Sequence, residues 1–243
     1  MRDPLHIAGD AFLKTATRWL ASRDAEHLTD LVGLGGMALS SADKLRSAFR
    51  KPDEEQGSVV GGDAGRTGMD LGALGLMAAP SAAALHHLAT NKATTRPLAG
   101  GGSKLTNAVN LASLAALMAP GVDKLQAKLR GGDDKRLMSD RTHEALEVAG
   151  LGGLAGGVAG GMWKDRSARN LAEGSALLAG YGTLAAPAVH GLVHPHHAEP
   201  ADPAAPAPAN PDAGHWKKPL SEIAGLSLLA VPSIAHAMAR GPH

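Results

Sequence analysis

The sequence predicts an all-α protein: an array of about six short helical-hairpin repeats with a period of about forty residues. Three observations lead to this prediction. Alanine, leucine and glycine dominate the chain, and aromatic residues are only 2% of its 243 residues. Apolar residues recur at the spacing of a helix. Finally, side chains forty positions apart match, which indicates a supersecondary unit whose apolar face is buried by its neighbours.

The match is closest across three units and continues more loosely over the rest of the chain. One apolar position recurs in every unit and should form the core of the repeat. Its residues are Leu34, Leu74, Leu114, Leu151, Tyr181 and Leu226. If the units are structurally equivalent, these six side chains should be equally buried.

A turn former or proline stands at the same place in the three clearest units, at Ser40, Pro80 and Pro120. Proline loses no hydrogen bond in the first turn of a helix, whereas inside an exposed helix it costs about 3 kcal/mol. We therefore expect two short helices that meet at this position. The alternative is one kinked helix of about twenty residues in each unit.

The units are flanked by segments of different composition. The predicted parts are an amphipathic helix at 1–25, helical repeats one to five at 26–193, a Pro/Ala/His-rich linker at 194–219 and a tethered last repeat at 220–243. Alternating Ala and Pro at 200–211 predict an extended spacer. We expect it to carry the last helix away from the other units, to dock on a partner. The apolar face of that helix is formed by Ile223, Leu226, Leu229 and Ile234.

Charge and cysteine content exclude several functions. The 24 basic and 23 acidic residues are interspersed, so no basic surface for direct nucleic-acid binding is expected. The absence of cysteine excludes disulfides and thiolate metal sites. The first residues lack a basic region followed by an apolar run, so no secretory signal is expected.

Long uncharged stretches make membrane insertion the main alternative to a water-soluble array. They lie at 71–91, 105–122 and 174–197, and each is long enough to cross a bilayer. Lys and Arg show no bias between alternate connections, which argues against a simple multi-span protein.

Residues able to carry chemistry are few. His190 and His194 are four apart, a spacing that can bind a transition metal, but no carboxylate joins them and a polar helix end is the favoured interpretation. The glycines at 150–155 imitate a dinucleotide-binding loop without a preceding strand, and a small-residue helix explains them better. We therefore expect no catalytic residue, no cofactor and no metal, and no enzymatic activity.

Polar residues recur with the repeat as well. Asp30, Asp70 and Asn110 precede the apolar blocks and should cap helix N-termini; they would form a ligand-binding ring only if the units were arranged in a circle. Asp43 and Asp123 each begin an Asp-Lys-Leu sequence, which we expect to form a solvated helix edge.

Two Ala/Gly-rich segments, 74–81 and 224–233, both end in Pro-Ser. They resemble helical segments of uncharacterised minor virion proteins of tailed bacteriophages, including ejected internal proteins. The resemblance implies a non-enzymatic structural or assembly protein in the virion or cytoplasm, with a homo-oligomer and other structural proteins as its partners. The alternative is a membrane-inserting or membrane-anchored protein, for example an ejected channel-forming one.

Overall fold

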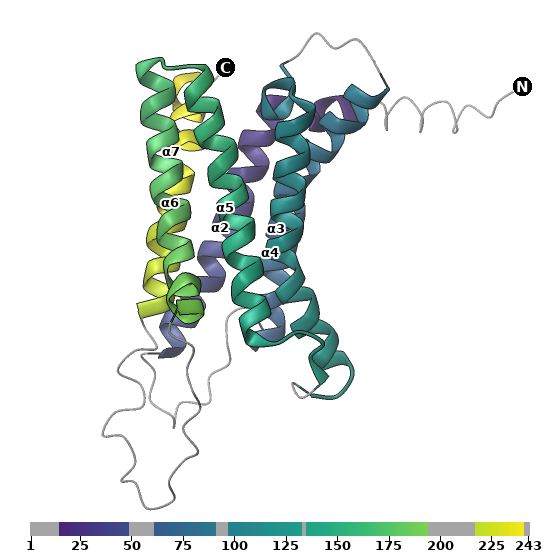
Figure 1. Ribbon diagram of the computed structural model, residues 1–243. Coiled ribbons are helices and arrows are strands. Elements are labelled where there is room, and N and C mark those ends of the chain that lie inside the picture. Colours follow the sequence, from purple (N-terminus) through teal and green to yellow (C-terminus); the bar gives the residue numbers. More distant parts are fainter. Residues whose placement is uncertain (1–14, 49–60, 91–96, 133–134, 194–216, 241–243) are drawn as a thin grey trace, which may run out of the picture.

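The computed structural model describes residues 15–48, 61–90, 97–132, 135–193 and 217–240. Within these segments the prediction of an all-α fold is confirmed, because six long helices form the structure and no strand occurs (Figure 1). The helices are α2 (Arg23–Ala48), α3 (Gly62–Ala89), α4 (Lys104–Leu129), α5 (Asp140–Lys164), α6 (Ala168–Val193) and α7 (Lys217–Arg240). A short 3-10 helix, η1 (Ala99–Gly102), precedes α4.

The six helices form a closed ring. Each helix packs on the next one in the chain, and α7 packs back on α2. Neighbours run antiparallel: Asp43, near the end of α2, pairs with Arg66 in the second turn of α3, and Asp123 on α4 pairs in the same way with His143 on α5. An even number of antiparallel helices allows the last to close on the first with the same geometry.

Each expected hairpin is instead one continuous helix, so the expectation of two short helices per unit is wrong. Pro80, Pro120, Pro187 and Pro232 all lie inside helices. An internal proline costs about 3 kcal/mol where it is exposed. Here Pro80, Pro120 and Pro232 are buried, so contacts with neighbouring helices offset the lost backbone hydrogen bond.

The residues expected to form the repeat core lie at similar depth. Five are less than a tenth exposed and Tyr181 is half-buried. The five are Leu34, Leu74, Leu114, Leu151 and Leu226. The buried leucines form two clusters, one of Leu34, Leu226 and Leu229 and one of Leu74, Leu114 and Leu154. Both clusters are contacted by Met37, Met77 and Tyr181, which makes the core continuous. Whether the units are true repeats with a forty-residue period stays a prediction.

The last helix is not carried away from the others, so that expectation is wrong. α7 lies between α6 and α2, and its Leu226 and Leu229 are buried against Leu34. Ile223 is half-buried and Ile234 is 39% exposed. The predicted spacer at 200–211 lies outside the described residues. So does most of the predicted N-terminal helix, of which residues 15–20 are helical.

Glycine explains why α7 packs so closely. A Cβ at Gly180 of α6 would lie 2.9 Å from the carbonyl oxygen of Gly225, and a Cβ at Gly225 would lie 3.0 Å from the carbonyl oxygen of Gly180. The two backbones therefore touch at a point that only glycine permits. Such contact lets a chain with few aromatic residues bury its leucines tightly.

Candidate functional site

The motifs considered for chemistry do not converge on a catalytic or metal site. His190 is exposed near the end of α6, and His194 lies outside the described residues. No group of three or more metal-binding side chains occurs in the part of the chain that the structure describes. Gly150 lies inside α5, where a Cβ would come within 2.7 Å of the Ser113 carbonyl oxygen. Gly150 and Gly153 therefore serve close packing of α5 on α4.

Asp30, Asp70 and Asn110 lie inside α2, α3 and α4 rather than at their N-termini, so their interpretation as caps is wrong. Ser103 and Ser139 cap α4 and α5 instead, each accepting a hydrogen bond from the backbone N–H three residues on. The helices begin about two turns earlier than the apolar blocks, at Arg23, Gly62 and Lys104.

The two Asp-Lys-Leu sequences do not form solvated edges, since both aspartates are buried. Asp43 accepts a hydrogen bond of 2.7 Å from Nε of Arg66. Asp123 is 3.0 Å from Nε2 of His143 and accepts hydrogen bonds of 2.9 and 3.3 Å from the backbone of Leu137 and Met138. Each aspartate therefore fixes the beginning of the next helix. In the sequence, the only signal for this role was that Asp43 and Asp123 are separated by two repeat lengths.

The lysines next to these aspartates contribute to a charged cluster inside one end of the ring. Lys44 of α2 is 3.2 Å from Glu222 of α7 and 3.7 Å from Asp70 of α3. Glu222 also accepts a 2.7 Å hydrogen bond from Ser41. Lys124 of α4 interacts electrostatically with Lys44 although α4 does not pack on α2, which places both inside the ring.

A second polar group is formed by Glu26 and Asp30, near the opposite end of the ring on α2, whose charges act on Tyr181 in the middle of α6. Both oxygens of Glu26 accept from the backbone N–H of Gly100, at 3.1 and 3.2 Å. Burial raises the pKa of Glu26. Burial, together with the charge of Glu26, raises the pKa of Asp30 to about 8. Asp30 is therefore mostly protonated at neutral pH.

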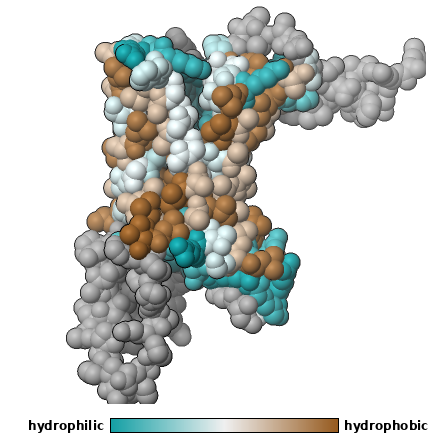
Figure 2. Space-filling model, in the orientation of Figure 1, coloured by the Kyte–Doolittle hydropathy of each residue, from teal (hydrophilic) through white to brown (hydrophobic). Residues whose placement is uncertain are grey.

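In contrast to the charged and polar groups inside the ring, the outer surface is uncharged along the middle of the helices. In α2 to α7, every exposed charged residue of the described segments lies within the first two or last three residues of its helix; the others lie in connections, or in the helical residues 15–20 in the case of Arg18. Between these ends, most exposed residues are small or apolar; Gln126, His86 and His190 are polar and lie in the last turns of their helices. On α3, α4 and α5 they include Gly68, Gly72, Leu76, Ala82, Ala108, Ala112, Ala115, Val122, Ala145, Ala149, Gly152, Gly156 and Ala159. We call this surface the uncharged belt. Figure 2 shows hydrophilic residues gathered at the two ends of the bundle, with apolar and neutral residues between them.

Three helices carry the longest apolar segments. By length and composition α3, α4 and α5 are each able to cross a membrane, and at most a third of the apolar segment in each is buried within the bundle. A helix that is apolar all round is normally covered by protein or by lipid. These three helices are covered on their inner sides alone.

An exposed tryptophan stands at one edge of the belt. Trp163, in the last turn of α5, is 76% exposed, and the guanidinium of Arg166 lies 4.7 Å from its ring centroid. Trp19, just before α2, is 39% exposed. The start of α2 and the end of α5 lie at the same end of a ring of antiparallel helices, so both tryptophans belong to one edge.

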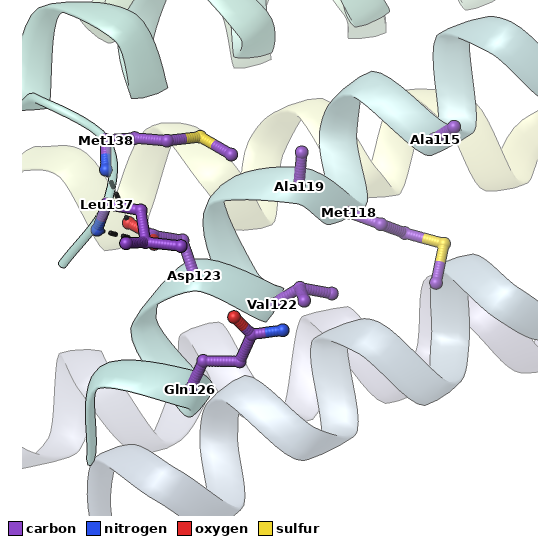
Figure 3. Close-up of a pocket in the computed structure, with 8 residues that line it drawn as sticks. All are labelled: Ala115, Met118, Ala119, Val122, Asp123, Gln126, Leu137 and Met138. Carbon is purple, nitrogen blue, oxygen red and sulfur yellow. Dashed lines mark hydrogen bonds between the residues drawn. The ribbon is translucent and has the colours of Figure 1, made fainter. Parts of the chain in front are cut away.

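An open groove of about 350 Å³ runs along the outside of α4 and the connection to α5 (Figure 3). Its lining is formed by Ala115, Met118, Ala119, Val122, Asp123, Gln126, Leu137 and Met138. Both carboxylate oxygens of Asp123 are already hydrogen-bonded to the backbone of the connection. The groove therefore offers few polar groups for a specific small ligand.

Comparison with known proteins adds no relative to this description: the chain matches no family model, no curated protein and no solved structure.

Proposed function

We propose that this protein is a membrane-inserting helical bundle without enzymatic activity, in which α3, α4 and α5 enter the bilayer. The observation that supports this most strongly is the uncharged belt between two charged ends. A soluble monomer rarely exposes a contiguous apolar surface of more than a few hundred Å². Here the exposed middle of all six helices lacks charge, while charged residues lie at the ends or face the ring interior.

Segment length agrees with this proposal. The charge-free segments are 71–89 in α3, 105–122 in α4 and 148–163 in α5. At 1.5 Å per residue they are about 28, 27 and 24 Å long, close to the roughly 30 Å hydrocarbon layer of a bilayer.

The inward direction of the remaining charges fits a lipid environment. Lys44 is 3.7 Å from Asp70 inside one end of the ring, and the opposite charge of Glu147 acts on Lys124 at the same end. Ionisable residues of membrane helices face the bundle interior and pair there, because a charge in lipid is costly. Trp163 fits as well, because tryptophan is enriched at the interface between lipid and water.

Flotation with liposomes tests the proposal through two lysine substitutions on one helix. Ala112 is exposed in the middle of α4, and Gln126 is exposed near its end. A lysine in the middle of a spanning helix costs about 2.5–3.5 kcal/mol, so Ala112→Lys should reduce bilayer partitioning on the order of 100-fold. Gln126→Lys, with the same added charge, should float like the wild type. Equal partitioning of both variants, or no wild-type flotation, would contradict insertion through α4.

A second candidate function is that of a structural assembly protein in which other copies of the chain cover the belt. It is favoured by Gly152, Gly156 and Gly160, which are exposed on α5 with open space around them and would permit close helix approach. The role in a phage particle rests on the sequence resemblance alone. A defined oligomer without detergent, measured by native mass spectrometry, together with no liposome binding, would favour this candidate over membrane insertion.

A further inference from the structure

Two histidines meet at the seam between α2 and α7, the contact that closes the ring. The rings of His27 and His236 are stacked, with centroids 4.2 Å apart and planes inclined by 29°. The Nε2 atoms of both rings are buried and have no hydrogen-bond partner. Stacked imidazoles point their nitrogens sideways instead of toward a common point, so this pair is not arranged to share a metal ion.

Several charged groups face this pair from the surrounding helices. Arg23 and Asp24 lie on α2 and Glu173 lies on α6. The Asp24 carboxylate is 3.9 Å from Nε2 of His236, too far for a hydrogen bond. Burial lowers the pKa of His27 to about 4; His236 and Arg23 add to this, while Glu173 and Asp24 act in the opposite direction. His27 lies in the second turn of α2, outside the three apolar helices.

We propose that the stacked His27–His236 pair makes closure of the bundle at the α2–α7 seam sensitive to acid. In the closed ring, a proton on His27 places a charge in a buried site against the ring of His236. Once α7 separates from α2, water solvates the His27 ring, which then takes up a proton readily. Acid therefore favours the open seam.

The direction and size of the effect follow from linkage. Because closure keeps His27 neutral, the contribution of His27 to the stability of the closed seam is complete above the ordinary histidine pKa of about 6.5. This contribution is lost as the pH falls toward 4. Between pH 7.5 and pH 5, His27 alone should weaken closure about 30-fold. Glu26 and Asp30 respond in the opposite sense, because burial favours their protonated forms. The effect must therefore be measured at α7 itself.

Hydrogen exchange on the full chain, corrected for intrinsic rates, measures this opening helix by helix. The wild type should lose about 30-fold protection in α7 between pH 7.5 and pH 5, while the middle of α4 keeps its protection. His27→Phe retains a flat ring for stacking and has no titrating nitrogen, so α7 should become insensitive to pH. His86→Phe is the matched control: His86 is an exposed histidine in the last turn of α3, and this variant should behave like the wild type.

Two results would overturn the proposal. One is simultaneous loss of protection in α7 and α4, which would mean global acid unfolding. The other is an undiminished loss in α7 of His27→Phe. If that variant does not fold, His27→Gln, which also has no group that titrates between pH 5 and pH 7.5, tests the same residue with the same expected outcomes. The inference does not depend on membrane insertion, because the seam is formed by α2 and α7.

Discussion

The contact between Gly180 and Gly225 should limit the stability of the whole ring. In Gly180→Ala the new methyl group would lie 2.7 Å from Cδ2 of Leu229 and 2.9 Å from the Gly225 carbonyl oxygen. A leucine can change rotamer to avoid a methyl group, but a helix backbone cannot. The substitution therefore forces α7 away from α6 by a few tenths of an ångström.

The expected size of the effect follows from two opposing contributions. Overpacking a well-filled contact costs about 1–3 kcal/mol. Replacing glycine by alanine in a helix contributes about 1 kcal/mol of stability in return. Gly180→Ala should thus lower the free energy of unfolding by about 0–2 kcal/mol. Gly182→Ala, on the same helix with no atom within 4 Å of its new Cβ, should raise it by up to about 1 kcal/mol.

Urea unfolding of the two variants, followed by circular dichroism, measures the difference, since both substitutions carry the same change in helix propensity. The expected gap is about 1–3 kcal/mol in favour of Gly182→Ala. Equal stability of the two variants would show that α6 and α7 do not touch at Gly180. It would also refute the argument that glycine contacts hold the ring closed.

Three further outcomes follow from the polar contacts. Asp123→Ala should destabilise the protein in unfolding measurements, because it leaves the backbone N–H groups of Leu137 and Met138 and the buried His143 ring without the Asp123 carboxylate. Asp30→Asn should stabilise the protein at pH 7.5 and flatten the pH dependence of its stability between about 4 and 8. Because folding raises the pKa of Asp30, its contribution to stability is complete below the unfolded pKa and is lost as the pH rises through 8. Unchanged thermal melts across this range would contradict this expectation. Gly100→Ala should destabilise the folded protein by more than about 1 kcal/mol. Gly100 has a φ of +58°, and a Cβ there would meet the Asn107 side chain at 2.8 Å. A wild-type melting temperature for this variant would refute the expectation.

The sequence by itself determined the helical class and identified several of the buried leucines. Leu34, Leu74 and Leu114 are buried as their spacing predicted, because burial of an apolar stripe depends on local periodicity and composition. The uncharged stretches were equally visible, since membrane-length segments are a property of the chain alone. The function of these stretches was not visible, because sequence does not say which side of a helix meets its neighbours.

Only the tertiary structure decided that the units are single helices and that they close into a ring. Pro80 and Pro120 remain inside helices because neighbouring helices bury them, an effect that local propensity does not contain. Asp43 and Asp123 are buried because the next helix supplies Arg66 and His143. The place of α7 depends on contacts between residues about 180 positions apart, such as Ser41 with Glu222. Such pairings are set by the shape and charge of surfaces that exist only after the helices have packed, so no local pattern encodes them.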